Sequence, residues 1–298
     1  MNIAIVVTFN KLQLLKGCLK AILNQTAKID KVVVVDNNSR QDTVDYLKNI
    51  ADDRVDVTYL KHNIGGAGGF NIGMKRAMSF NPELLWIMDD DTEPYPTAFE
   101  EILKAKANVN TPFGFIGSNV RWIDGSACVM NVPAVSEVWN DLTSQHLVQA
   151  RCCSFVSVCV SASAVKQVGY PVADFFIWGD DVEYTTRLSR TYKNYIALDS
   201  LATHLMAENK GVDILHEAPN RIPRYYFDVR NKFYIAKRNG FTATIKYLVK
   251  TFVLLMQVIF TSNFKWIKVR TILKGFFAGV IFNPVVEYYS RGSDNDTK

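Results

Sequence analysis

Apolar and polar residues alternate in blocks along the first hundred residues, and the spacing within the blocks changes regularly. Runs rich in β-branched residues occupy 3–9, 31–35 and 55–61, whereas 11–25 and 42–50 carry apolar residues at helical spacing. Strands that alternate with helices predict a parallel sheet with right-handed crossovers. Residues 32–35 are apolar without alternation, which is typical of a strand covered on both faces.

The pattern loosens after residue 91. A helix is predicted within 94–107, and strand material is predicted at 113–125 and 152–169, the latter running into a helix. We therefore expect an α/β fold with a mixed, mostly parallel sheet that continues to about residue 205. The expected organisation is a catalytic domain at 1–223, a C-terminal helical region at 224–290 and a disordered tail at 291–298.

The C-terminal region is aromatic and basic from residue 224 onward, then strongly apolar with lysines and an arginine interspersed. Its uncharged stretch, 251–264, is shorter than the roughly 18–20 residues that span a bilayer, so we expect no membrane-spanning segment. Apolar faces flanked by cations suit helices that lie in a membrane interface. An ordinary pair of helices packed on the core or on another subunit is the alternative.

Composition narrows the class of protein only modestly. The net charge of +5 does not by itself imply nucleic acid, and we expect no nucleic-acid partner. Five cysteines without a CxxC pair favour reduced thiols in a cytosolic protein. The first residues lack a basic segment before the apolar run, so they are interpreted as a buried strand and not as a signal peptide.

Polar residues follow three of the predicted strands directly. They are Thr8 and Asn10, then 36–39, then the three consecutive aspartates 89–91. Ligands in such sheets bind beyond the carboxyl ends of the strands, so the three sets are expected on one rim. Mg²⁺ or Mn²⁺ prefers carboxylate oxygens. On an extended backbone Asp89 and Asp91 would face one metal while Asp90 points away. A solvated acidic loop or a capped helix start is the alternative.

Three further segments carry candidate chemistry. Residues 63–77 hold five glycines ahead of a predicted helix, a pattern that brings backbone close to phosphates but also occurs in simple turns. A second acidic cluster, 180–183, leads into another helix. Acidic residues favour a first helical turn whatever their function, yet a partly buried carboxylate there suits a general base. His204 ends a strand-like segment, where it is either a structural residue or a metal ligand.

Taken together, these segments resemble the inverting glycosyltransferases of family 2 with the GT-A fold, most closely the galactofuranosyltransferase and rhamnosyltransferase branch. The pieces that carry the resemblance span residues 1 to about 205: "VVTFN", "VVVVDNNS", "NIGGAGGFNIGM", "WIMDDDTEP", "FFIWGDDVEY" and "THL". One departure is Lys11, because some relatives carry arginine at that position.

The resemblance implies a role for each matched residue. Asp181 is the expected catalytic base, and Asp89, Asp91 and His204 are the expected ligands of a divalent metal, Mn²⁺ or Mg²⁺. Trp178, Asp180 and Glu183 are expected to contact the acceptor. The expected nucleotide-sugar-binding residues are Thr8, Asn10, Asp36, Asn38, Gly66, Gly68, Gly69, Asn71 and Asp90.

The implied reaction moves galactofuranose from UDP-galactofuranose to a glycan or polyprenyl-diphosphate-linked acceptor in bacterial surface polysaccharide synthesis. The enzyme would lie peripherally on the inner face of the cell membrane, and homo-oligomerisation is left open. A rhamnosyltransferase that uses dTDP-rhamnose is the nearest alternative. A sugar nucleotidyltransferase is disfavoured because "VVTFNKLQLL" has no glycine-rich triphosphate loop. A non-catalytic sugar- or lipid-binding protein is the last alternative.

Overall fold

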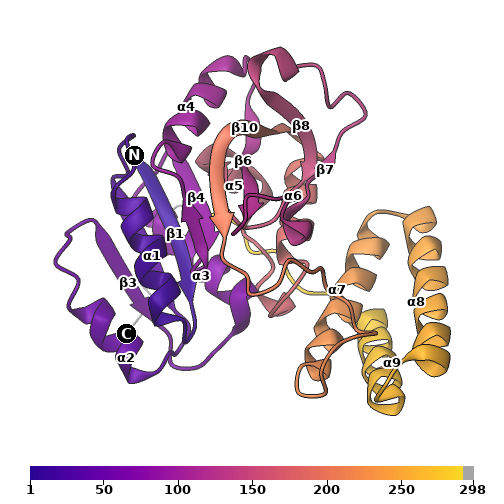
Figure 1. Cartoon of the computed structure of the whole chain (residues 1–298). Helices are drawn as coiled ribbons and strands as arrows, with labels where there is room; N and C mark the ends of the chain where they lie inside the picture. Colours follow the sequence, from indigo (N-terminus) through magenta and orange to yellow (C-terminus); the bar gives the residue numbers. More distant parts are fainter. Residues whose placement is uncertain (291–298) are drawn as a thin grey trace.

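A single mixed sheet forms the centre of the molecule in this computed structural model, which describes residues 1–290 (Figure 1). Within those residues the sheet has ten strands, in the order β3-β2-β1-β4-β9-β6-β10-β8-β7, with β5 added at β10. The strand bounds are Asn2–Thr8 (β1), Lys31–Asp36 (β2), Val55–Tyr59 (β3), Leu84–Asp89 (β4), Thr92–Pro94 (β5), Phe113–Trp122 (β6), Ala134–Val135 (β7), Leu147–Cys152 (β8), Val158–Ser161 (β9) and Lys193–His204 (β10).

The helices follow the strands in alternation through the first half of the chain. Their bounds are Leu12–Leu23 (α1), Gln41–Lys48 (α2), Gly65–Ser79 (α3), Ala98–Asn108 (α4), Ala162–Val168 (α5), Asp180–Leu188 (α6), Tyr225–Arg238 (α7), Phe241–Thr261 (α8) and Lys265–Ile281 (α9). Short 3-10 helices lie at Val129–Asn131, Thr143–Gln145, Ala173–Phe175 and Ile222–Arg224.

The predicted parallel sheet is confirmed, and so is its extension to about residue 205. Strands β3, β2, β1 and β4 are parallel neighbours, and β6 and β10 are parallel to each other. Strand β9 runs antiparallel between β4 and β6 and makes the sheet mixed. Because β1, β2 and β4 are parallel, their carboxyl ends lie on one edge.

Strand β1 shows why both faces of the sheet are covered. Ile3, Ile5 and Val7 belong to the cluster that contains residues of α3 and α5, whereas Ala4 and Val6 pack with residues of α1 and α4. The alternation of a strand thus places apolar side chains on both faces.

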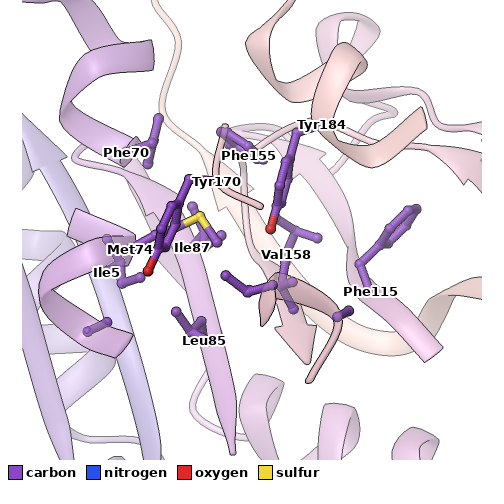
Figure 2. Packing of buried hydrophobic residues seen from close by; sticks show 14 of the residues in the cluster. Ile5, Phe70, Met74, Leu85, Ile87, Phe115, Phe155, Val158, Tyr170 and Tyr184 are labelled. Carbon is purple, nitrogen blue, oxygen red and sulfur yellow. The ribbon is translucent and has the colours of Figure 1, made fainter. Parts of the chain in front are cut away.

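The first of these clusters is drawn in Figure 2, where aromatic and aliphatic side chains from several elements meet. Phe70 contacts Phe155 edge to face at 4.9 Å between ring centres, and Phe155 contacts Tyr184 at 5.9 Å. These contacts join α3 and α6 across the segment before β9. Each fully buried side chain of this size contributes about 1.5–3 kcal/mol.

Helices α7, α8 and α9 form a group beside the sheet (Figure 1). Helix α7 joins this group to the part of the chain that contains the sheet, because Tyr234 packs on Phe175 while Val229 packs with residues of α8 and α9. The expected division at residue 223 stays a prediction. The tail predicted to be disordered, 291–298, lies outside the described residues.

The length of helix α8 contradicts the expectation that no segment is long enough to cross a membrane. It has 21 residues and meets the length and apolarity required for crossing, by those criteria alone. The expectation counted only uncharged residues, whereas Lys246 and Lys250 lie in the first half of this helix.

Candidate active site

The polar ends of β1, β2 and β4 converge as predicted. The Thr8 hydroxyl donates to Asp90 Oδ2 at 2.8 Å, and the Phe9 amide donates to the same oxygen at 3.3 Å. The Asn10 amide donates to Ser39 Oγ at 3.0 Å. The rim therefore brings together residues that lie up to 82 positions apart in the chain.

The three aspartates do not lie on an extended backbone. Strand β4 ends at Asp89, a turn occupies Asp90 and Asp91, and β5 begins at Thr92. The expected alternation of their side chains is therefore wrong. Asp90 instead faces Thr8, and Asp91 faces β10, because a turn redirects successive side chains through different angles from a strand.

Lys11 lies directly on this cluster. Its Nζ is 2.7 Å from Asp91 Oδ2 and 3.6 Å from Asp90 Oδ1. Burial lowers the pKa of Lys11, but the charges of Asp91 and Asp90 outweigh this and raise it above its usual range. Lys11 therefore stays charged and offsets part of the repulsion among the carboxylates.

Asp91 and His204 form the second contact of the cluster. Asp91 Oδ1 lies 3.2 Å from His204 Nε2, is buried, and has no hydrogen-bond donor. His204 Nδ1 lies 2.8 Å from Asn131 Oδ1, an oxygen that can only accept, so Nδ1 carries a proton and the Nε2 of a neutral ring presents a lone pair. Two lone pairs that face one another in this way fit a divalent cation held by both side chains.

The third expected ligand, Asp89, does not join this pair. Among residues 1–290, no group of three histidine, cysteine, aspartate or glutamate side chains has the arrangement of a metal site. Metals of this kind commonly use one or two carboxylates and complete their shell with phosphate oxygens of the substrate. Asp91 and His204 fit such a shared site, whereas the role predicted for Asp89 finds no geometric support.

The surroundings of the other two carboxylates, Asp89 and Asp90, disfavour their charged forms. Burial, followed by the charges of Asp91 and Asp90, raises the pKa of Asp89 well above its usual range. Burial also raises the pKa of Asp90 to about 6, against the opposing effects of Lys11 and Thr8. A buried cluster whose carboxylates are costly to ionise is stabilised by a bound cation, and shifted pKa values of this kind are common at functional sites.

The second acidic cluster lies at the N-terminus of α6. Asp180 is buried, and burial together with the charge of Asp181 raises its pKa to about 8. Burial raises the pKa of Asp181 to about 6, although the amide of Val182 donates to its Oδ1 at 2.7 Å. The charge of Asp180 also raises the pKa of Asp89, so the two acidic clusters lie within electrostatic reach.

Glu183, the third acid of this cluster, is already paired with Arg187. Both of its carboxylate oxygens accept from Arg187, each at 2.9 Å, and both side chains are buried. Arg187 also donates to the carbonyls of Val168 and Tyr170. A carboxylate that is committed to a buried bidentate pair cannot bind an acceptor without exposing an unpaired arginine, so this geometry argues against the predicted acceptor contact.

The glycine-rich segment lies within helix α3 and not ahead of it, contrary to the prediction. A side chain on Gly69 would come within 2.5 Å of Val7, and one on Gly68 within 2.7 Å of Ile64. These two glycines allow close packing on β1 and on Ile64, the residue just before α3, whereas Gly66 faces open space. Asn71 lies apart from the rim because it donates to the Pro171 carbonyl and to Glu287.

The other predicted nucleotide residues border the rim. Asp36 is buried and accepts from the Ser39 amide, and Asn10 Oδ1 accepts from the amide of residue 40 at 2.8 Å. Asn38 is exposed with φ 64°. Trp178, predicted to contact the acceptor, has its ring 5.1 Å from that of Tyr225.

Sequence reasoning missed three residues near the site. Lys11 was noted only as a departure from relatives, although it contacts Asp91. Asn131 and Asn231 were not considered, and both contact segments distant in sequence. A lone asparagine in an irregular segment carries no pattern, so only tertiary contacts reveal it.

Comparison with known proteins places this geometry in a family. The family model "Glycosyl transferase family 2" matches residues 3–120, which include β1, β2, the glycine-rich segment and the three aspartates. A curated relative, galactofuranosyltransferase GlfT1 of Mycolicibacterium smegmatis, is 27% identical over 255 residues, covering 80% of this chain and 83% of that protein. This match assigns residues 3–120 of the chain to glycosyl transferase family 2. The chain is a glycosyltransferase, as the family model and the curated relatives show.

Solved structures confirm the GT-A fold of the chain. S. aureus TarS 1-349 in complex with UDP-GlcNAc aligns with TM-score 0.55 and 12% identity, covering 93% of this chain and 72% of that one. GalNAc-T7 with UDP, GalNAc and Mn²⁺ aligns with TM-score 0.59 and 14% identity, covering 80% and 50%. The family model and the curated relatives favour a glycosyltransferase over the nucleotidyltransferase and the non-catalytic protein.

Proposed function

We propose that this enzyme transfers galactofuranose from UDP-galactofuranose, with inversion, to a lipid-linked glycan acceptor at the inner face of a bacterial membrane. The observation that carries the proposal is the paired arrangement of acids: Asp91 with His204 at one side, and the buried Asp180 with the partly buried Asp181 at the other. The name of the M. smegmatis relative supports the donor.

Asp181 is the group proposed to accept the proton. The acceptor hydroxyl attacks the anomeric carbon, its proton passes to the Asp181 carboxylate, and the bond from that carbon to the diphosphate oxygen breaks. Because burial raises the pKa of Asp181 to about 6, the carboxylate is a better base than an exposed aspartate and is still ionised at neutral pH. Direct displacement leaves the anomeric configuration inverted.

The leaving UDP carries away two electrons of the broken bond as negative charge. Asp91 and His204 would hold a divalent metal, which supplies charge neutralisation on the diphosphate when it is bound. A metal in one structural neighbour, GalNAc-T7, supports this part of the proposal. Lys11, which already contacts Asp91, would add a second positive charge beside the same phosphates.

The proposed membrane contact is the outer face of α8 and α9. In the most apolar stretch of α8 only 6% of the residues are buried, and Phe241, Phe260, Trp266 and Ile281 are each at least 77% exposed. Between residues 229 and 286 the sequence has no acidic residue, and its ten basic residues are Arg230, Lys232, Lys237, Arg238, Lys246, Lys250, Lys265, Lys268, Arg270 and Lys274. Exposed apolar area combined with positive charge suits an anionic bilayer surface.

A donor panel tests the reaction. Purified enzyme with Mn²⁺ receives UDP-galactofuranose, UDP-galactopyranose, UDP-glucose or dTDP-rhamnose, each with and without sugar acceptors, and nucleoside diphosphate release is measured. We expect turnover of UDP-galactofuranose that is lost in Asp181→Asn and on metal chelation. Turnover of dTDP-rhamnose alone would assign the donor of the rhamnosyltransferase branch instead.

Vesicle sedimentation tests the membrane contact. Full-length protein should pellet with phosphatidylglycerol vesicles more than with phosphatidylcholine vesicles, and less at high salt. Replacing Phe260 and Trp266 together by aspartate should abolish pelleting, whereas the control Val132→Asp, also at an exposed apolar residue, should not. Equal behaviour of the two variants would contradict the proposal. Retention in carbonate-washed membranes would indicate instead that α8 crosses the bilayer.

A further inference from the structure

The segment that leads into the second acidic cluster adopts an unfavourable backbone. Phe176 has φ 65° and ψ −62°, and the Ile177 amide donates to the Phe175 carbonyl at 2.8 Å to close a three-residue turn. Trp178 and Gly179 follow with φ 64° and 86°. A γ-turn with positive φ is rare and strained, and non-glycine residues with positive φ persist only where their surroundings hold them.

Asn231 of α7 holds this turn from one side. It is fully buried, and its Nδ2 lies 3.0, 3.1 and 2.8 Å from the carbonyl oxygens of Phe175, Ile177 and Trp178. Its Oδ1 accepts from Arg230 Nε at 3.0 Å, which fixes the orientation of the amide. One side chain thus contacts three carbonyl oxygens of the strained segment.

Arg230 extends the same contact. Its Nη2 donates to the carbonyls of Asp174 and Phe175 at 2.6 and 3.1 Å. The guanidinium carbon also lies 3.9 Å from the ring centre of Phe282, so the arginine is held between the turn and the residue that follows α9. These contacts leave the arginine little freedom to release the turn.

Helix α3 holds the turn from the other side. The Ala67 amide donates to the Phe176 carbonyl at 3.2 Å, and a side chain on Gly65 would lie 2.0 Å from that oxygen. Gly65 has φ 79° and permits this approach. The turn is therefore fixed between the start of the glycine-rich helix and α7, and Asp180 follows it immediately as the first residue of α6.

We propose that Asn231, oriented by Arg230, is a positioning residue that holds the strained turn 175–179 so that Asp180 and Asp181 face the reacting groups. The inference rests on the proposed role of Asp181 as the base. Helix α7 would then have two roles: Val229 packs with α8 and α9, and Asn231 holds the turn. Removing the amide donors should let the turn relax and displace the carboxylates.

The test compares Asn231→Leu and Asn231→Asp with the control Val229→Ala. Both Asn231 variants approximate the original size but lack the amide donors, whereas the control removes packing from the opposite face of α7. Hydrogen exchange of the peptide 174–183, UDP affinity by calorimetry with Mn²⁺, and kcat with the donor that the wild-type enzyme uses are measured. The turn should exchange at least about tenfold faster in the Asn231 variants, and kcat should fall about 10²-fold, the cost of misplacing a reacting group.

UDP affinity should stay within about twofold of wild type, because the donor rim does not include Asn231, and Val229→Ala should keep kcat per folded molecule. If exchange of 174–183 is unchanged, or if it rises without a loss of kcat, the positioning role is wrong. A parallel loss of kcat and UDP affinity in all three variants would also overturn it, since that result describes a general loss of structure.

Should the Asn231 variants fail to fold, Arg230→Lys replaces them, because it removes the planar donors but keeps the charge, and it should lower kcat about tenfold. Retained kcat in Arg230→Lys would overturn the inference. A separate measurement tests whether Asp181 is the base. Turnover in Asp181→Asn would refute that role, while hydrogen exchange would still decide whether Asn231 holds the turn.

Discussion

Replacement of the buried Asp180 by asparagine should stabilise the protein progressively as the pH rises. Burial and the charge of Asp181 raise the pKa of Asp180 from 3.8 to about 8. A carboxyl group whose pKa is higher in the folded state binds more protons there than in the unfolded chain. Between pH 3.8 and pH 8, the wild type therefore loses folding free energy as the pH rises.

The size of this effect follows from the pKa difference. One pKa unit corresponds to about 1.4 kcal/mol, and pH 5 and pH 7 both lie between the two pKa values. Ionising Asp180 should thus cost the wild type up to about 3 kcal/mol over that interval, a cost that Asp180→Asn lacks. At about 2–4 °C per kcal/mol, the difference in Tm should widen by roughly 5–10 °C.

Thermal unfolding of both proteins at pH 5, 6 and 7 measures the effect. Any pH-independent cost of burying the amide cancels when the Tm difference is compared between pH values. The exposed Asp141→Asn serves as the matched control and should show no widening. If the Tm difference for Asp180→Asn is constant or narrows with rising pH, the carboxylate is stabilised by hydrogen bonds in its charged form, and the burial argument is refuted.

Three further predictions concern the base and the metal pair. The kcat of the wild type should rise with pH and level off above about 6, where Asp181 is ionised, and Asp181→Asn should lower kcat about 10²–10⁴-fold; a flat pH profile would argue against this base. Lys11→Met should tighten Mn²⁺ binding without nucleotide a few-fold, measured by calorimetry, because a half-exposed cation no longer competes for Asp91; unchanged affinity would contradict this. Asn131→Leu should weaken Mn²⁺ binding about 10–100-fold, measured by electron paramagnetic resonance, because His204 loses the partner that orients its ring; wild-type affinity would exclude that role.

Much of the site was open to prediction because its residues follow strands. Thr8, Asp36 and Asp90 each lie at the carboxyl end of a parallel strand, and parallel pairing alone places such ends on one rim. The acids 180 and 181 were predicted for a similar local reason, since they begin a helix after an aromatic segment. In these cases local pattern and topology gave the same answer.

Other parts of the site depended on contacts that no local pattern encodes. The turn at Asp90 and Asp91 separated the aspartates that an extended backbone would have aligned, because β5 must reverse direction to pair with β10. Glu183 was drawn into a buried pair by Arg187, one helical turn away, whose remaining donors reach the carbonyls of residues 168 and 170.

The sequence by itself determined the alternating strands and helices, the apolar faces and the acids at strand ends, because these follow from periodicity over a few residues. Only the tertiary structure decided which carboxylate meets His204, that Lys11 lies on Asp91, and that Asn231 holds the turn before Asp180. Those contacts join residues about 50 to 113 positions apart, and their geometry is set by how the sheet, α3 and α7 pack together, which short-range patterns do not contain.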